Sequence, residues 1–488
     1  MKKAVFLLAA VCLLFTNCSK DRDETWGFEN FNYSGDWNGD YTGEQYNEII
    51  ENPFIEVAEN PVSTFSIDVD GASYSNTRRF LNNGSLPPAD AIRTEEVVNY
   101  FSYDYSEPSG NEPVFVDGEV TVCPWDGSHK LIRIGMKGKH INKQDLPAAN
   151  IVFLIDVSGS MSSSDKLELL KQGYILFVNE LRDQDKVAIV TYAGSWEIAL
   201  PSTYCSDKQT IINAINELGS GGSTAGSEGI ITAYKIAEQN FIENGNNRVI
   251  LGTDGDFNVG ISDQDELVAL IEEKRESGVY LTVLGVGTGN LNDGMMEQLA
   301  DNGNGNYEYI DNIEQAKKVF IYDYNSFYTV AQDVKIQIEF NAELVHSYRL
   351  IGYENRVLNE EDFEDDDKDA GEIGSDQTIT ALYEIIPTES TTNVRIIDID
   401  FRYKYPGEEH SNLFSLEVFD SGSTFENASE NMRFAASAAS FALLLRDSDY
   451  KGNATYDYIL EWAGNAMDHN PHNYKTEFLI LVQKAKTL

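Results

Sequence analysis

Basic residues are scarce in this sequence. Its 488 residues include 36 lysines and arginines against 80 aspartates and glutamates, which gives a formal net charge of −44. So little positive charge leaves no surface that could recruit the phosphates of DNA or RNA, and nucleic acid is not an expected partner. Cations are the natural counter-species of such a surface. Scattered carboxylates alone, however, define no metal site, so the spacing of particular residues must decide.

Prolines and long apolar runs are also few. The chain has 12 prolines, with 42% hydrophobic and 11% aromatic residues, a composition typical of a folded protein. Its length exceeds what one ordinary core accommodates and indicates two to four domains. Beyond the N-terminal leader no segment is apolar for long enough to predict a membrane-spanning helix.

The N-terminus resembles an export signal. Two lysines precede an apolar run from Ala4 to Phe15, and Cys18 follows shortly after it. The run is short for a bilayer span, and a cysteine at its end resembles the lipobox of bacterial lipoproteins. We expect a signal peptide over residues 1–17, lipidation of Cys18 as the only membrane attachment, and a tether over residues 18–43. An unmodified, secreted form is the alternative.

The acidic residues after Cys18 resemble signals that place some Bacteroidetes lipoproteins on the cell surface. This favours a lipid-anchored protein of the cell envelope, in the outer membrane and exposed at the surface. Only Cys123 and Cys205 remain beyond the leader and Cys18. An oxidising compartment would allow a disulfide between them, but their sequence separation says nothing about their distance in space.

Short β-branched apolar runs alternate with amphipathic helices between residues 150 and 328. This alternation predicts a parallel sheet covered by helices on both faces. The loop from Gly219 to Gly226 separates two of the helices and is too rich in glycine to belong to either. The expected strands, each followed by a helix, are Ile151–Ile155, Val187–Tyr192, Arg248–Gly252, Tyr280–Val286 and, more weakly, Tyr307–Ile310.

The segments on either side differ in character. Residues 44–149 are expected to hold a strand-like stretch from Thr64 to Asp70, two helices and a β-hairpin over 114–138. Asp68 and Asp70 in that stretch indicate a structural or inter-domain contact. Residues 329–488 are expected to form a β-rich and then helical domain, with strands at Asp333–Phe340, Ser347–Tyr353, Thr378–Ile386 and Val394–Tyr405 and a buried helix at Phe434–Leu445.

The hairpin over 114–138 is expected to pair with the strands of residues 330–420, which would make the central domain an insertion between them. The fold class predicted for the whole chain is α/β. A doubly wound, mostly parallel, Rossmann-like sheet over residues 150–328 is flanked by a β-rich unit and a helical C-terminal tail.

Oxygen-bearing side chains follow three of the expected elements. Asp156, Ser158 and Ser160 come after the first strand, Thr224 lies in the glycine loop, and Asp254 follows the strand at 248–252. Open α/β sheets bind ligands at the carboxyl ends of their strands, so these side chains are expected to meet there. Two carboxylates and several hydroxyls form a hard-oxygen site that suits Mg²⁺ or Mn²⁺, whereas Ca²⁺ would prefer more carboxylates.

The order D-x-S-x-S, then T in a glycine loop, then T-D-G resembles the metal-ion-dependent adhesion site of von Willebrand factor A domains. The resemblance implies that Ser158, Ser160 and Thr224 coordinate the ion directly or nearly so. Asp156 and Asp254 would act directly or through water. In that family one metal position stays open, and an Asp or Glu carboxylate of a protein partner fills it.

The resemblance extends beyond the central domain. The stretches Phe65–Leu81, Arg93–Phe101 and Asp367–Gly374, and the final F-L-I-L-V-Q-K-A-K-T-L, resemble bacterial YfbK-type von Willebrand factor A lipoproteins. That family has an N-terminal extension and a distinctive C-terminal domain. Gly71 is a departure, because the resemblance leads us to expect threonine there.

Other functions fit the same residues less well. Asp156 at a strand end could be a phosphotransferase nucleophile, but that chemistry needs a second carboxylate where Ser158 stands. No serine or cysteine nucleophile has an assignable histidine base, so the protein is not expected to be an enzyme. The expected function is metal-dependent binding of a protein partner. An envelope assembly scaffold with a structural metal site is the alternative, and a metal-dependent hydrolase is the least favoured.

Overall fold

The computed structural model describes residues 43–67, 70–221, 227–255, 264–388 and 392–488. They all belong to one compact unit, Thr42–Leu488. Within these ranges, none of the helices combines the length and the apolar character that crossing a bilayer requires.

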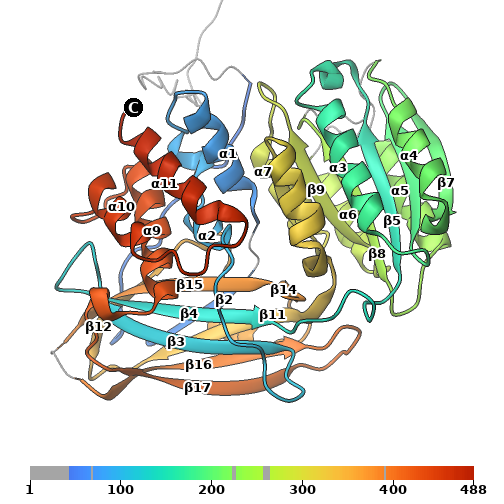
Figure 1. Ribbon diagram of the computed structural model, residues 1–488. Helices are drawn as coiled ribbons and strands as arrows, with labels where there is room; N and C mark the ends of the chain where they lie inside the picture. The colour runs from blue at the N-terminus through green and yellow to red at the C-terminus, as the bar shows by residue number, and fades with distance from the viewer. Residues whose placement is uncertain (1–42, 68–69, 222–226, 256–263, 389–391) are drawn as a thin grey trace, which may run out of the picture. The chain divides into compact units, whose positions relative to one another are not determined.

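The central part of the chain forms a six-stranded sheet (Figure 1). Its strands are β5 (Ala149–Asp156), β6 (Lys186–Tyr192), β7 (Trp196–Tyr204), β8 (Asn246–Thr253), β9 (Tyr280–Val286) and β10 (Tyr307–Ile310). They lie in the order β10-β9-β8-β5-β6-β7, and every neighbouring pair is parallel except β6 and β7. The five predicted strands are therefore confirmed, with small changes at their ends.

Alternate side chains of β5 enter different hydrophobic clusters on the two faces of this sheet. Ile151 and Phe153 join the cluster that contains residues of α3, α4 and α8, whereas Val152 and Leu154 join that of α5, α6 and α7. A strand buried on both faces has to be apolar along its whole length, and β5 is fully buried. The doubly wound, mostly parallel fold is confirmed. Its helices are α3 (Leu167–Glu180), α4 (Lys208–Glu217), α5 (Ser227–Gln239), α6 (Gln264–Arg275), α7 (Asp293–Asp301) and α8 (Ile313–Lys317).

The expectation that a helix directly follows every strand is wrong for β6. The antiparallel strand β7 comes next and forms the edge of the sheet. Of its nine residues only Leu200 is buried, so β7 carries no apolar run that would reveal it in the sequence. Its Pro201 is compatible with an edge strand, where a missing amide hydrogen costs no ladder bond.

Two antiparallel sheets pack face to face beside the central sheet (Figure 1). One has the order β1-β12-β15-β4-β3, and the other β13-β2-β11-β16-β17 with β14 added to β11. The strands are β1 (Ile55–Glu56), β2 (Val62–Ser66), β3 (Val114–Val122), β4 (Lys130–Gly138), β11 (Thr329–Phe340), β12 (Val345–Ile351), β13 (Val357–Leu358), β14 (Gly371–Gly374), β15 (Thr378–Pro387), β16 (Val394–Lys404) and β17 (Asn412–Asp420).

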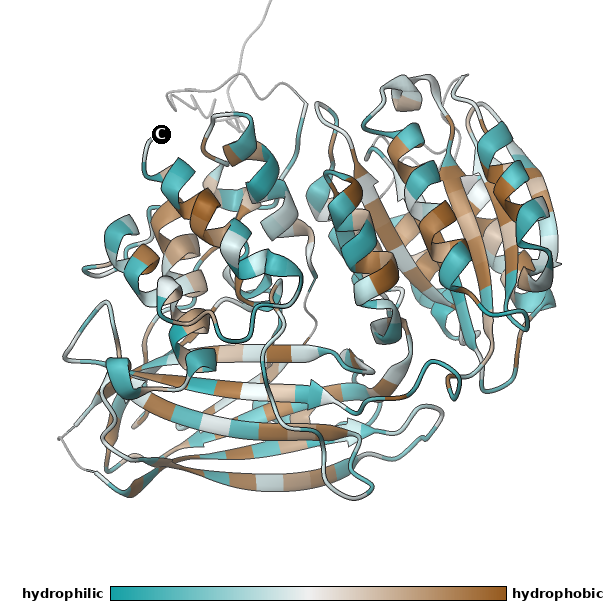
Figure 2. Cartoon of the chain, in the orientation of Figure 1, coloured by the Kyte–Doolittle hydropathy of each residue, from teal (hydrophilic) through white to brown (hydrophobic). Residues whose placement is uncertain are grey.

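The predicted pairing of the hairpin with the later strands is confirmed, because β4 pairs with β15 along its length. Strand β2 likewise pairs with β11. Figure 2 shows apolar and polar residues alternating along the strands of this sandwich. This alternation is expected when one face of each sheet packs against the other sheet and the opposite face is more polar. The central α/β domain is therefore an insertion between strands of one β-sandwich.

Strand β17 is absent from the sequence-based prediction. More buried and more exposed side chains alternate along β17. The exposed side chains, however, include apolar ones, Leu413 and Phe419, each 53% exposed. An edge strand with apolar residues on both faces lacks the hydrophobic–polar alternation on which such a prediction depends.

Five helices form a further layer over the first sheet of the sandwich (Figure 1). They are α1 (Ala72–Asn82), α2 (Thr94–Asn99), α9 (Glu430–Leu445), α10 (Tyr456–Gly464) and α11 (Tyr474–Ala485). Helix α9 is buried almost throughout, as predicted, and begins where the Ser429 side chain accepts a hydrogen bond from the Met432 amide. Its Phe434 and Phe441 pack edge-on against Phe478 of α11.

Cys123 and Cys205, the cysteines within the described residues, are both buried with free thiols. Cys123 belongs to the hydrophobic cluster of the helical layer and Cys205 to that of the central domain. The structure therefore contains no disulfide between them, although the sequence left that pairing open.

Candidate metal centre

Asp156 ends β5 at the centre of the sheet and is fully buried. Its Oδ1 accepts a hydrogen bond of 2.8 Å from the Ser158 amide, and the Thr253 hydroxyl lies 3.4 Å from its Oδ2. The turn that follows is held in place by Met161, whose buried side chain packs in the hydrophobic cluster between the central sheet and α3. Burial raises the pKa of Asp156 to about 6 despite the Ser158 hydrogen bonds.

The two serines of the D-V-S-G-S loop lie together. The Ser158 and Ser160 hydroxyl oxygens are 2.9 Å apart. Ser158 is buried, whereas Ser160 is exposed to solvent. The loop therefore presents a pair of hydroxyls beside a buried carboxylate, with one side open to solvent.

Asp254 follows β8, the parallel neighbour of β5. It is also fully buried, and its Oδ2 accepts a hydrogen bond of 2.8 Å from the Lys166 ammonium. The desolvation of Asp254 acts to raise its pKa, but hydrogen bonds from Lys166 and Asn290 outweigh this and hold the pKa below its ordinary value. Ser160 also hydrogen-bonds to Asp254, which joins the loop after β5 to the loop after β8.

Gly255 completes the T-D-G sequence and requires glycine. Its φ is +93°, and a Cβ there would lie 2.5 Å from the backbone nitrogen of Asn292. The close approach packs the loop after β8 against the connection between β9 and α7.

The structure brings four of the five predicted ligands to one edge of the sheet: Asp156, Ser158, Ser160 and Asp254. Thr224 lies outside the described residues. The described end of its loop is nearby, because the Gly221 amide donates a 2.7 Å hydrogen bond to the Val157 carbonyl. Cys18, the predicted site of lipidation, also lies outside the described residues.

Lys166 and Asn290 were not predicted from the sequence. Lys166 directly precedes α3, and its ammonium also hydrogen-bonds to the Asn290 side chain at 3.1 Å. No spacing rule links Asn290 to Asp254. Lys166 follows the D-V-S-G-S loop closely in the sequence, and this proximity is the only sequence signal that could have indicated that the lysine contacts the site.

This donor set fits a divalent ion. It offers two carboxylates and two hydroxyls, the hard oxygen ligands that Mg²⁺ and Mn²⁺ prefer, on a side that solvent can reach. Two buried carboxylates so close together also favour a bound cation, because the charge of Asp254 adds to the desolvation that raises the pKa of Asp156. The Lys166 ammonium neutralises only one of the two charges.

The described histidine rings give no support to nucleophilic catalysis. Their side-chain hydrogen bonds go to carboxylates, from His129 to Glu384 and from His140 to Asp376. Within the residues described, no serine or cysteine is bonded to a histidine ring in the manner of a catalytic pair.

Comparison with known proteins agrees with this architecture. The family model of the von Willebrand factor type A domain matches residues 150–320. A family model for von Willebrand factor matches residues 40–133, and a family model for the C-terminal region of uncharacterized protein YfbK matches residues 325–488. The fold and its loops thus define a von Willebrand factor A domain protein.

The chain is 42% identical over 467 residues to the uncharacterized protein YfbK of Escherichia coli K12, covering 90% of this chain and 81% of the relative. It therefore belongs to the YfbK family. It is also 26% identical over 167 residues to human inter-alpha-trypsin inhibitor heavy chain H3, covering 32% of this chain and 18% of the relative. A von Willebrand factor type A protein from Catenulispora acidiphila, 15% identical with a TM-score of 0.45, covers 77% of this chain and 91% of its own.

Proposed function

We propose that this protein binds another protein through a divalent cation held at the carboxyl edge of its central sheet. The observation that carries the proposal is the convergence of Asp156, Ser158, Ser160 and Asp254 on one side that is open to solvent. With Thr224 they make up the ligand set of a metal-ion-dependent adhesion site. Mg²⁺ or Mn²⁺ suits these ligands better than Ca²⁺ does.

The ion would supply an electrophilic position that accepts a carboxylate oxygen of the partner. The chain's own groups prepare that position. Lys166 keeps Asp254 ionised and fixes its orientation, while the Ser158 amide orients Asp156. A carboxylate on the partner is consistent with the net charge of −44, because screening over about 8 Å at physiological salt leaves the ion's field dominant at contact. The association rate should therefore rise with salt.

An exposed aromatic side chain at the same edge supports a protein ligand. In the strand register Asp156 is opposite Tyr192, and Tyr192 is opposite Trp196. Trp196 is 40% exposed, and its indole nitrogen donates to Glu228 at 2.9 Å. Tryptophan is enriched among the residues that dominate the binding energy of protein interfaces. We assign Trp196 to the partner-binding surface.

Crosslinking and affinity capture from cell envelopes test this function. A partner retained in Mg²⁺ should be lost in EDTA and with Asp156→Ala, and weakened by Trp196→Ala. Asp145→Ala is the matched control, because Asp145 is exposed and precedes β5 at the opposite end of the same strand. Binding that is insensitive to both EDTA and Asp156→Ala would show that the metal is not involved.

The alternative, an envelope scaffold whose metal is structural, gives a different result in the same experiment. Chelation would then lower the midpoint of thermal unfolding and leave binding intact in the protein that stays folded. A metal-dependent hydrolase, the least favoured function, would require a turnover that Asp156→Asn abolishes.

The location in the cell envelope is part of the proposal. It rests on the apolar run from Ala4 to Phe15 followed by Cys18. Metabolic labelling with a radioactive fatty acid should mark the wild-type protein and not Cys18→Ser. Equal labelling of the two, or none of the wild type, would contradict the lipid anchor.

A further inference from the structure

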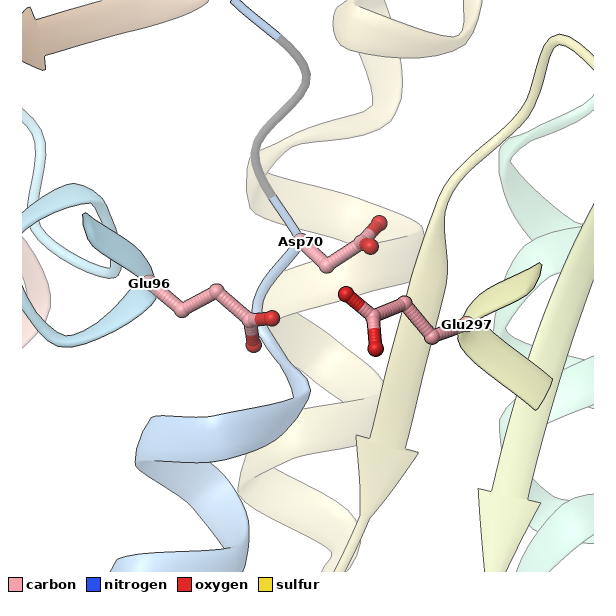
Figure 3. A group of neighbouring side chains, drawn as sticks. All are labelled: Asp70, Glu96 and Glu297. Carbon is pink, nitrogen blue, oxygen red and sulfur yellow. The ribbon is translucent and has the colours of Figure 1, made fainter. Parts of the chain in front are cut away.

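Three buried carboxylates from distant parts of the chain converge outside the predicted metal centre (Figure 3). Asp70 lies two residues before α1, Glu96 lies in α2 of the same N-terminal segment, and Glu297 lies in α7 of the central domain. Each offers a carboxylate oxygen, and these oxygens all lie within 4.8 Å of one another. The residues are only 5%, 2% and 5% exposed, respectively.

One oxygen in this cluster has no hydrogen-bond partner. Oδ1 of Asp70 accepts a 2.6 Å hydrogen bond from the Tyr307 amide, but Oδ2 of Asp70 is buried and accepts none. The nearest guanidinium nitrogen, that of Arg356, is 3.9 Å away and therefore beyond hydrogen-bond distance. Figure 3 shows the Glu96 and Glu297 side chains pointing toward each other, with the Asp70 carboxylate beside that of Glu297. A buried carboxylate oxygen without a partner is costly, which indicates a ligand at this point.

The charges around the cluster are also out of balance. Arg93 contacts Glu96 and lies 2.6 Å from Asp293 and 3.5 Å from Glu297, while Arg356 lies 2.6 Å from Asp301. Five carboxylates, those of the cluster plus Asp293 and Asp301, therefore share two guanidinium groups. A further positive charge would relieve this repulsion.

A cavity of about 270 Å³ borders the cluster at Asp70. Its wall includes Asp70 and Gly71, and also Glu308 and Lys318. A Cβ at Gly71 would lie 2.6 Å from the Glu308 carboxylate, so Glu308 packs directly against this glycine and a larger residue here would displace it.

We infer that Asp70, Glu96 and Glu297 bind a Ca²⁺ ion that fastens α7 of the central domain to the N-terminal segment. Three carboxylates without a hydroxyl or an imidazole form a hard, strongly anionic ligand set, which Ca²⁺ favours. Its oxygen distances of about 2.3–2.6 Å separate opposite ligands by about 5 Å. The three carboxylate oxygens all lie within 4.8 Å of one another, so one ion could contact all of them. The ion would sit against the unpartnered oxygen of Asp70 and share Glu96 and Glu297 with Arg93.

The experiment measures Ca²⁺ binding to the full exported chain by equilibrium dialysis at pH 7.5. Asp156→Ala is the background, so that the predicted adhesion site contributes nothing whether or not that site exists. We expect this protein to bind one Ca²⁺ and to unfold at a higher temperature with Ca²⁺ than with EDTA. Adding Glu297→Gln should abolish both effects.

The matched control is Glu314→Gln in the same background, because the Glu314 side chain is 64% exposed and pairs with Lys317 in the next turn. It should bind Ca²⁺ like the background protein. Glu297→Gln keeps an oxygen that can accept the 2.7 Å hydrogen bond from Asn355, which favours an intact fold. Asp70→Asn is the second variant if Glu297→Gln fails to fold, and it should lose Ca²⁺ in the same way.

Two results would overturn this inference. One is undiminished Ca²⁺ binding by a folded Glu297→Gln or Asp70→Asn protein. The other is no Ca²⁺ binding by the folded Asp156→Ala background, for which an infrared band of protonated carboxyl groups near neutral pH, removed by Glu96→Gln, would identify what replaces the ion. In that second case protons, and not a metal ion, balance the cluster.

Discussion

Replacement of Arg78 tests how firmly the three parts of the chain are joined. Arg78 is in α1, and its side chain is 2% exposed. It hydrogen-bonds to Asp311 at 2.9 and 2.5 Å, to Gln315 at 2.9 Å and to Tyr100 at 2.8 Å, and it pairs with Glu477 at 3.1 Å. One guanidinium thus connects the N-terminal helices, the central domain and the last helix of the chain.

The cost of Arg78→Met follows from the burial of its partners. The Asp311 side chain is 4% exposed and would remain as a buried charge without its guanidinium, which costs about 3–5 kcal/mol. The Glu477 side chain is 38% exposed, so the loss of that pair adds little. With a urea slope of about 3 kcal/mol/M or more for a chain of this size, the midpoint of unfolding should fall on the order of 1 M.

Urea unfolding followed by tryptophan fluorescence measures this shift. Arg395→Met is the matched control, because the Arg395 side chain is 49% exposed and its pairs with Asp398 and Glu417 are at the surface. The control should lose about 1 kcal/mol or less. If Arg78→Met lowered the midpoint no more than Arg395→Met does, the reasoning that this arginine joins the three parts would be refuted.

Three further substitutions have distinct expected outcomes. Lys166→Met removes the ammonium from buried Asp254 and should cost about 3 kcal/mol in EDTA, measured by thermal unfolding; an unchanged midpoint would contradict their pairing. Phe434→Ala should lower the free energy of unfolding by about 3–5 kcal/mol, because its ring fills the helical layer; a loss near zero in urea would contradict that packing. The hydrogen bond with Asp376 raises the pKa of His140. The pair therefore stabilises the protein fully at pH values below the ordinary histidine pKa, and this stabilisation is lost as the pH rises through the raised pKa of His140. Asp376→Asn should lower that pKa in an NMR titration, and an unchanged pKa would contradict the contact.

Patterns within short stretches of sequence predicted much of the fold. The parallel strands are recognisable because burial on both faces requires continuous apolar runs, as in β5. The pairing of β4 with β15 follows from the need of a hairpin to cover its edges, although the partner is more than two hundred residues away. Strands β7 and β17 have no such signature, because both are edge strands with exposed apolar residues.

The residues of the candidate site likewise include some that could be predicted from the sequence and some that could not. Asp156 and Asp254 could be predicted because each follows a recognisable strand, and adjacent parallel strands bring their carboxyl ends together. The contact of Lys166 with Asp254 could not be predicted, because it depends on where the folded loops place the lysine side chain and follows from no sequence spacing. For Asp70 a structural or inter-domain contact was predicted, and its hydrogen bond with the amide of Tyr307, in the central domain, confirms it. Its meeting with Glu297 could not be predicted, since it depends on how the N-terminal segment packs against the central domain.

Calorimetric titration with Mg²⁺ is the most direct test of the central claim that Asp156 and its neighbours bind a divalent ion. The wild-type chain, Asp156→Ala and Asp145→Ala should be compared under identical conditions. The account predicts that Asp156→Ala loses one bound Mg²⁺ relative to the wild type, whereas Asp145→Ala retains it. Wild-type stoichiometry and affinity in Asp156→Ala, or no Mg²⁺ binding by the wild type, would contradict the account.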